Sequence, residues 1–224
     1  MIINQRKGVN MKLSSKGQKL IEMYSSMATD GYDRTDGQHV ENAFSDFELR
    51  PFRHDIQKIL LDNNIQSILD YGSGGSDWEL DGFDPETNES AKDFFKLETV
   101  FKYEPARSID ERQPVDCVLS FDVLEHIFIS DVPNTLRDIL SYANKMLILN
   151  IACYPAAAKL PNGENAHITV RHPDWWKGMV DSVAVEFPHV SILLICSKAW
   201  RKANGFPIYS GNLWLADQKF VVNY

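Results

Sequence analysis

Short apolar segments that end in, or are closely followed by, a glycine, an acidic residue or a proline constrain the fold of this chain more than any other feature. They lie at residues 66–71, 99–105, 115–121 and 145–153. Apolar runs of this length, bounded by turn residues, are typical of buried strands. Strands that are apolar throughout belong to parallel sheets, because helices cover both faces of such a sheet.

Segments with helical spacing separate the strands. Pro133 suits the first turn of a helix over 132–145, and Leu136, Ile139 and Leu140 form one face of that helix. Strands that alternate with helices predict an α/β fold with a mostly parallel sheet. The same patterns predict further helices from about Ser14 to Met27, over 41–63 (divided by Pro51) and over 173–185, and late strands over 189–198, 213–217 and 218–224.

Composition excludes several classes of protein. The chain has 224 residues, of which 44% are hydrophobic, and a formal net charge of −8. These values indicate one globular domain, and they exclude a disordered, collagen-like or disulfide-rich chain. The excess of acidic residues argues against non-specific binding of nucleic acid, because such binding depends on Lys and Arg that neutralise phosphates. A small basic spot at Lys198, Arg201 and Lys202 is interpreted as solvated surface.

The cysteines and the apolar stretches bear on the cellular compartment. Cys117, Cys153 and Cys196 form no CxxC pair and have apolar neighbours, so we expect buried free thiols and a reducing environment. The first residues contain no continuous apolar run of the secretory type. The longest apolar stretch, 146–158, is too short and interrupted to span a bilayer. We therefore expect a cytoplasmic protein without a membrane segment.

The residues that follow each strand are the candidates for a site, because ligands of open α/β sheets bind beyond the carboxyl ends of the strands. The first such segment, DYGSGGS, runs from Asp70 to Ser76. Its glycines allow a tight turn and a close approach of the backbone to a ligand. An ordinary strand-to-helix turn is the alternative. The dinucleotide fingerprint GxGxxG is not met, because Asp77 stands where it requires glycine.

Glu104 ends the second strand. A carboxylate at this place can accept hydrogen bonds from the two hydroxyl groups of a ribose. A solvated glutamate at a strand end is the alternative. Asp84 is a competing carboxylate, but it follows no convincing strand.

The third segment, SFDVLEH, leads from an apolar strand directly into Asp122, Glu125 and His126. Asp122 and His126 are four residues apart, so they lie on one side if the segment is helical. His126 could then act as a general base. The alternative is that Asp122 caps a helix and His126 is merely packed.

The fourth segment is the loop that carries His167, followed by Trp175 and Trp176. His167 could face the pocket, and the tryptophans could stack on a ring of a ligand. The alternative for Trp176 is a core position that anchors the following helix.

Taken together, ILDYGSGGS, YEPA and FDVLEHI resemble the class I S-adenosylmethionine-dependent methyltransferases, of the small-molecule and sugar type with a DVLEH motif. The resemblance runs over residues 68–176, about half of the chain. Ser76 stands where the family usually has the third glycine of its loop. The spacing also departs from the family: 34 positions separate Asp70 from Glu104, and little chain remains before residue 115 for a third strand.

The resemblance implies a Rossmann-like three-layer sandwich with a mostly parallel sheet and an antiparallel last strand, here trimmed in its middle region. It implies one methyltransferase-like domain over 1–224. Within it we expect residues 1–12 to be flexible, 13–63 to form a helical lid region, and 64–224 to form the Rossmann-like core. Tyr24 and Tyr32 would belong to the lid.

The resemblance also implies roles for single residues, with S-adenosylmethionine as the cofactor. The glycine loop would surround the methionine part, the second strand end would hold the ribose, and the fourth strand end would lie near the sulfonium. His126 and His167 would be the catalytic bases. Ile109 or Asp110 would contact the adenine. The predicted cofactor-binding residues are Asp70, Tyr71, Gly72, Ser73, Gly74, Glu104, Pro105, Phe121 and Asp122.

The predicted function is methyl transfer to a small molecule such as a sugar, a sugar nucleotide or another metabolite. One alternative is a non-catalytic binding protein that kept the fold. Another is a metal-assisted O-methyltransferase, because Asp122, Glu125, His126 and His167 are similar to the ExxEH…H site of small-RNA 2′-O-methyltransferases, with Asp in place of the first Glu. A nucleotide-binding oxidoreductase is a third alternative, against which the mismatch at Asp77 counts.

Overall fold

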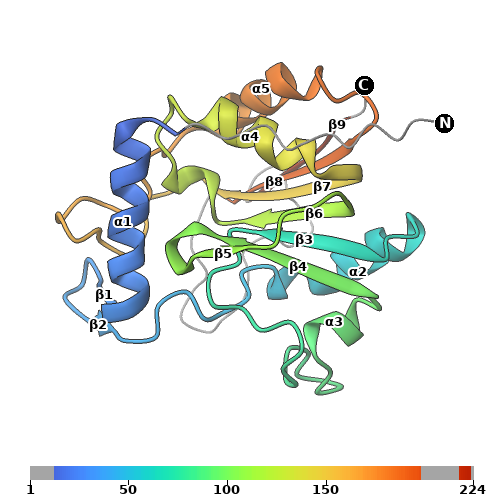
Figure 1. Ribbon diagram of the computed structural model, residues 1–224, viewed down its shortest axis with the longest axis horizontal. Coiled ribbons are helices and arrows are strands. Elements are labelled where there is room, and N and C mark those ends of the chain that lie inside the picture. Colours follow the sequence, from blue (N-terminus) through green and yellow to red (C-terminus); the bar gives the residue numbers. More distant parts are fainter. Residues whose placement is uncertain (1–12, 198–216, 223–224) are drawn as a thin grey trace.

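The computed structural model describes residues 13–197 and 217–222. Its centre is a seven-stranded sheet of order β5-β4-β3-β6-β7-β8-β9 (Figure 1). A separate two-stranded ribbon follows the first helix. The strands are β1 (Tyr32–Asp33), β2 (His39–Val40), β3 (Ser67–Tyr71), β4 (Thr99–Glu104), β5 (Ile109–Asp110), β6 (Val115–Phe121), β7 (Ala143–Ala152), β8 (Ser191–Ser197) and β9 (Asp217–Val222).

Strands β4, β3, β6, β7 and β8 are parallel, whereas β5 and β9 pair antiparallel at the two edges. The predicted α/β class, the mostly parallel sheet and the antiparallel last strand are therefore confirmed. Of the strands in the seven-stranded sheet, β3 comes first along the chain, and it lies between β4 and β6. The strand order therefore reverses at β3. Such a reversal opens a crevice at the carboxyl ends of the strands.

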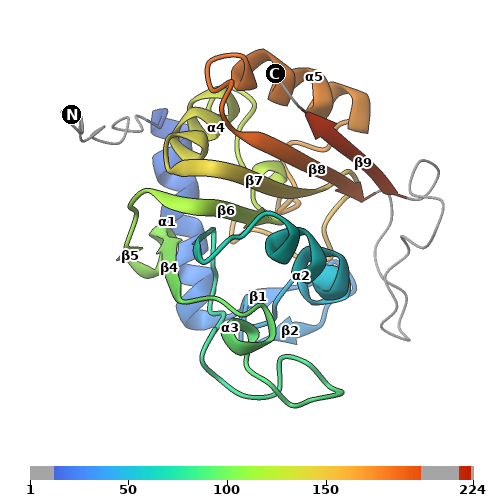
Figure 2. The same cartoon turned by 90° about the vertical axis from the view of Figure 1, so that its right-hand side faces the viewer.

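Helices cover both faces of the sheet, which makes three layers (Figure 2). Successive residues of a strand point to opposite faces. Ile68 accordingly packs in the core beneath α2 and α3, whereas Leu69 packs in the core beneath α4 and α5. The helices are α1 (Ser15–Asp30), α2 (Arg53–Asp62), α3 (Ala91–Phe94), α4 (Val132–Ser141) and α5 (Pro173–Ala184), with single 3₁₀ turns η1 (Arg50–Phe52), η2 (Pro105–Arg107) and η3 (Leu124–His126).

The residues predicted as a helical lid, 13–63, divide into two parts with different places in the fold. Helix α1 crosses the carboxyl edge of the sheet, whereas α2 belongs to one of the covering layers (Figure 1). The expectation of a helix from residue 41 is wrong, because helical structure begins only at Arg50. Pro51 suits this start, since proline is favoured in the first turn of a helix.

The predicted trimming of the middle region is confirmed. Strand β5 has two residues, and in the described part of the chain only the turn η2 joins it to β4. No α-helix lies between β4 and β6 there. The predicted flexible segment 1–12 and most of the predicted strand 213–217 lie outside the described residues. No helix within 13–197 or 217–222 is long and apolar enough to cross a membrane.

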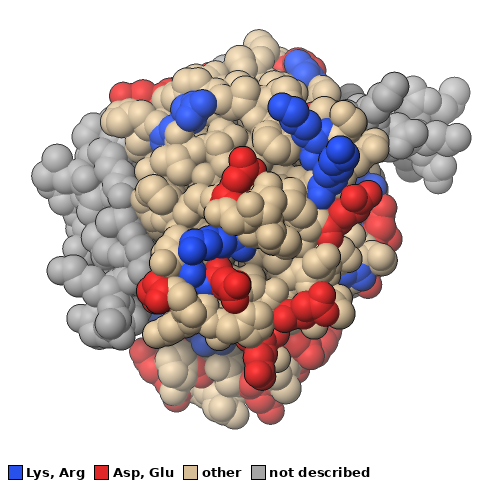
Figure 3. Space-filling model, turned by 90° about the vertical axis from the view of Figure 1, so that its left-hand side faces the viewer, with Lys and Arg blue, Asp and Glu red and all other residues tan. Residues whose placement is uncertain are grey.

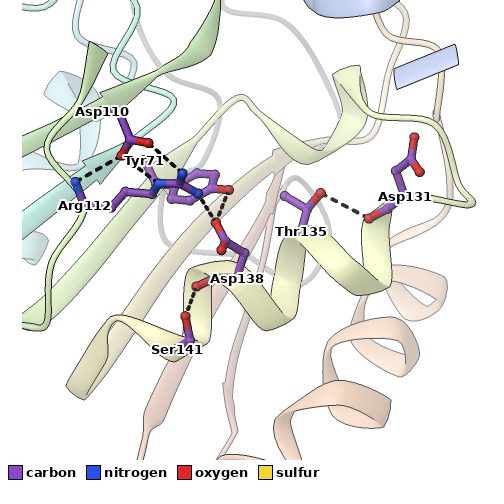
Figure 4. A network of polar contacts seen from close by, with 7 residues as sticks. All are labelled: Tyr71, Asp110, Arg112, Asp131, Thr135, Asp138 and Ser141. Atoms are coloured by element: carbon purple, nitrogen blue, oxygen red, sulfur yellow. Dashed lines mark hydrogen bonds and ion pairs between the residues drawn. The ribbon is translucent and has the colours of Figure 1, made fainter. Parts of the chain in front are cut away.

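A polar network ties the trimmed edge to α4 (Figure 4), with Tyr71 and Asp138 buried and Asp110 at the surface. The Tyr71 hydroxyl and Nη1 of Arg112 both donate to Oδ2 of Asp138, each over 2.8 Å. Arg112 also binds Asp110 through Nε and Nη2, and its guanidinium lies 4.0 Å from the centre of the Tyr103 ring. Ionic and aromatic contacts therefore fix the edge where the crossover helix is missing.

Replacing Asp138 with alanine tests this network. The side chain is fully buried, so its loss leaves the charge of Arg112 without a partner on α4. We expect Asp138→Ala to lower the free energy of unfolding, measured by urea denaturation, by about 3–5 kcal/mol. The matched control is Asp62→Ala, which removes an exposed ion pair with Lys58 and should change stability by less than about 1 kcal/mol. Equal effects of the two substitutions would contradict the role of Asp138.

Candidate functional site

A cavity of about 510 Å³ lies at the carboxyl ends of β3, β4 and β6. This volume is within the range of sites for small ligands. Helix α1, residues 40–49 and residues 156–158 supply its other walls. Apart from the expected adenine contacts, the residues predicted for cofactor binding or catalysis line it: Asp70, Tyr71, Gly72, Ser73, Gly74, Glu104, Pro105, Phe121, Asp122, His126 and His167.

The backbone N–H groups of the glycine loop, residues 72–76, all donate within the chain. The acceptors are the carbonyl oxygens of Tyr103, Phe44 and Ser73 and the carboxylate of Glu104. A loop that cradles a pyrophosphate needs free N–H groups directed at the ligand. This loop offers none from residues 72–76, which counts against a dinucleotide cofactor.

The glycines of the loop are needed by the packing of the chain itself. Gly72 and Gly74 have φ angles of +85° and +55°, which favour glycine. A Cβ atom on Gly74 would lie 2.7 Å from the carbonyl oxygen of Phe44, and one on Gly72 would lie 2.3 Å from Cγ2 of Val123. The loop is therefore pressed between the segment before α2 and the segment after β6.

Asp70, near the end of the strand that precedes the glycine loop, contacts residues at the end of the loop and just after it. Its Oδ2 accepts a hydrogen bond from Nε1 of Trp78 over 2.8 Å and lies 3.0 Å from the hydroxyl of Ser76. Burial raises the pKa of this carboxyl group to about 6, although the two donors oppose the shift. Ser76, which replaces the third glycine of the resembling motif, thus contributes a hydroxyl beside Asp70.

Glu104 joins the second strand end to the glycine loop. Its Oε2 accepts from the N–H of Gly74 over 2.9 Å, and its Oε1 accepts from the N–H of Ala106 over 3.0 Å. Burial raises the pKa of this carboxyl group. Each carboxylate oxygen can accept a further hydrogen bond, so Glu104 can still bind a diol from the cavity side.

The other residues considered for cofactor contacts lie elsewhere. The competing carboxylate Asp84 is buried and accepts from Nε of Arg53 over 2.7 Å and from the N–H of Thr87. Ile109 and Asp110 are not among the residues that line the cavity, and Asp110 is paired with Arg112. The expected adenine contacts are therefore not found at β5.

The opposite part of the cavity brings together Asp122, His126 and His167. One nitrogen or oxygen atom from each side chain lies within 4.8 Å of the other two. Asp122 follows β6 with a φ angle of +57°, and the turn η3 carries His126 back to the same side. Asp122 and His126 thus lie on the same side, as predicted, but a bend and a 3₁₀ turn place them there rather than an α-helix.

His126 is held by its Nδ1 atom. This nitrogen lies 2.6 Å from the Tyr24 hydroxyl and 3.1 Å from the carbonyl oxygen of Ala166. Burial and the neighbouring His167, whose ring centre is 4.6 Å away, lower the pKa of His126 to about 4. The imidazole is therefore neutral at pH 7, and it is a weak base.

His167 and Glu125 have different places in this group. Nδ1 of His167 lies 2.5 Å from the carbonyl oxygen of Tyr154, and its ring reaches the cavity. Glu125 is one of the candidate ligands of the alternative, metal-assisted site, but it is fully buried, accepts from the N–H of Ala152, and does not line the cavity. Burial and the charge of Asp122 hold the pKa of the Glu125 carboxyl group well above its usual range.

The core position considered for Trp176 is confirmed, and neither tryptophan lies where it could stack on a ligand in the cavity. Trp176 is fully buried in the core beneath α4 and α5, and Trp175 packs against the same core. Neither lines the cavity. The apolar face of α5 turns toward the sheet, which carries both rings away from the strand ends.

The cavity also has an aromatic wall that only the fold reveals. Tyr24, Tyr32 and Phe44 line it together, and the rings of Tyr32 and Phe44 stack with centres 5.5 Å apart. Tyr24 and Tyr32 are the predicted lid residues. No sequence pattern pointed to Phe44, nor to Arg34 and Arg107, which also line the cavity.

The face on the α1 side of the molecule carries basic and acidic side chains next to one another (Figure 3).

Comparisons with models of known families, with curated proteins and with solved structures find no match to this chain. The site is therefore interpreted from its own geometry.

The pH dependence of stability tests the burial of Asp70. Because the pKa of its carboxyl group, about 6, lies above the ordinary value of 3.8 for aspartate, the folded chain binds this proton more tightly than the unfolded chain does. The folded state therefore loses stability through Asp70 as the pH rises from about 4 to about 6. Relative to Asp70→Asn, we expect the wild type to lose on the order of 2–3 kcal/mol of unfolding free energy over this range.

Urea denaturation of both proteins at several values between pH 4 and pH 7 measures this difference. A difference that stays constant, or that moves in favour of the wild type as the pH rises, would contradict the raised pKa.

Proposed function

We propose that this protein transfers the methyl group of S-adenosylmethionine to a small molecule. The observation that carries the proposal is the convergence of three strand ends on one cavity: the glycine loop after β3, Glu104 at the end of β4, and Phe121 and Asp122 at the end of β6. The sequence resemblance assigns a part of this cofactor to each of the three.

The chemistry of the cofactor fits the walls of the cavity. Its methionine part needs no phosphate cradle, in agreement with a glycine loop whose N–H groups are already used. Glu104 keeps acceptor capacity for the ribose hydroxyls. A carboxylate such as Asp122 attracts a positively charged sulfonium when the two lie close together.

The acceptor would occupy the space between His126 and the aromatic wall of Tyr24, Tyr32 and Phe44. Methyl transfer is a direct displacement, so the protein mainly aligns the nucleophile with the methyl group and accepts a proton where one is released. His126 and His167 are the bases proposed for that proton. A sugar, a sugar nucleotide or another small metabolite remains the proposed class of acceptor.

A non-catalytic protein with this fold is the second candidate, and one observation favours it. Both oxygens of Glu104 already accept backbone hydrogen bonds, so this carboxylate has a structural task whether or not a cofactor binds. Direct measurement of cofactor binding separates the two candidates.

Calorimetric titration with S-adenosylmethionine and S-adenosylhomocysteine is the test. We expect binding in the micromolar range, weakened at least about tenfold in Glu104→Ala, because a hydrogen bond to a charged group contributes about 1.5–3 kcal/mol. Glu98→Gln, an exposed glutamate just before β4, is the control and should bind as the wild type does. Circular dichroism would verify that each variant is folded. Failure of the folded wild type to bind either compound would overturn the proposal.

Replacing His126 with alanine separates catalysis from cofactor binding. We expect the affinity for S-adenosylmethionine to change little and the rate of methyl transfer to fall by about 100-fold or more, the usual contribution of a general base. Release of S-adenosylhomocysteine in the presence of an acceptor found by screening measures the rate. An unchanged rate on that acceptor would exclude His126 as the base.

A further inference from the structure

We infer that Asp122, His126 and His167 form a binding site for one divalent transition-metal ion. One donor atom from each side chain lies within 4.8 Å of the other two, and all three residues line the cavity. Around a metal with bonds of about 2.0–2.2 Å, ligand atoms lie about 3.0–3.6 Å apart. Closing the set around an ion therefore requires only small side-chain movements.

The hydrogen bonds of both histidines favour metal binding through Nε2. Nδ1 of His126 lies 3.1 Å from the carbonyl oxygen of Ala166, and Nδ1 of His167 lies 2.5 Å from that of Tyr154. A carbonyl oxygen can only accept, so each Nδ1 carries the proton when these bonds form. The lone pair is then on Nε2, as in histidine ligands whose other ring nitrogen donates to a carbonyl group.

Tyr24 is compatible with this arrangement. Its hydroxyl lies 2.6 Å from Nδ1 of His126 and donates to the carbonyl oxygen of Ala166 over 3.2 Å. The phenol oxygen can therefore accept from the Nδ1 proton while its own hydrogen points to Ala166. Helix α1, which carries Tyr24, thus helps to orient the proposed ligand.

Glu125 is not one of the inferred ligands. Its fully buried side chain accepts a hydrogen bond from the N–H of Ala152 and does not line the cavity. The inferred site therefore has three protein ligands, Asp122, His126 and His167.

The donor set indicates the class of ion. Two imidazoles and one carboxylate suit Zn²⁺, Co²⁺, Mn²⁺ or Fe²⁺, whereas Mg²⁺ and Ca²⁺ prefer sites made of oxygen alone. Three protein ligands leave coordination positions open, and the cavity adjoins all three. A small ligand with an oxygen donor can bind there. An imidazole that binds the ion through Nε2 has no lone pair left for a proton, so His126 and His167 can act as the proposed bases only in the metal-free protein. The inference does not depend on S-adenosylmethionine.

Titration with cobalt tests the site, because Co²⁺ bound to nitrogen and oxygen ligands absorbs visible light. The full chain without an affinity tag is stripped with a chelator, dialysed, and titrated with Co²⁺; Zn²⁺ is then added as a competitor. We expect one Co²⁺ per chain, displaced by Zn²⁺ but not by equal amounts of Mg²⁺. His167→Ala and the nearly isosteric Asp122→Asn should each weaken binding by about 100-fold, at least the effect of losing an outer hydrogen-bond partner.

His189→Ala is the matched control, because His189 is exposed and does not line the cavity. It should bind Co²⁺ as the wild type does, and circular dichroism would verify that all variants are folded. The inference is overturned if the wild type does not bind Co²⁺, or if folded Asp122→Asn and His167→Ala bind it as tightly as His189→Ala. Since no cofactor is present, this result is independent of whether the protein binds S-adenosylmethionine.

Discussion

The hydrogen bonds that the buried carboxylates of Asp70 and Glu104 accept are the interactions on which the site depends. Glu104 binds the N–H groups of Gly74 and Ala106, and Asp70 binds the indole N–H of Trp78. These bonds fix the ends of β3 and β4 and give the glycine loop its shape. Burial raises the pKa of both carboxyl groups, which means that it disfavours their ionised forms. The fold nevertheless places both groups at the point where the strand order reverses.

A second polar arrangement compensates for the trimmed sheet. A usual crossover between neighbouring parallel strands contains a helix that buries apolar surface. Between β4 and β6 the described chain instead has a 3₁₀ turn and a two-residue strand. Arg112 occupies this place and binds Asp110, Asp138 and the ring of Tyr103. The contacts of this guanidinium group therefore hold the edge of the sheet in place, a role that the apolar face of a crossover helix has in a usual parallel sheet.

The sequence predicted β3, β6, β7 and β8 well because each is a largely apolar run, typical of a buried strand. It failed where local patterns were overruled by packing. Residues 41–49 have helical spacing but form part of the wall of the cavity. Glu125 stands next to His126 in the sequence, yet one turn of 3₁₀ helix directs the two side chains to different environments.

The sequence by itself determined the α/β class and the residues at the strand ends, because these follow from local periodicity and from the rule that parallel strands share a carboxyl edge. The few residues between Glu104 and Val115 also predicted that a third strand would be missing or very short. Only the tertiary structure decided which side chains meet. His167 and Asp122 are 45 positions apart, and Phe44 reaches the glycine loop from a segment with no motif. Such contacts depend on how loops close over the sheet, and loop closure is fixed by packing between distant segments rather than by local sequence.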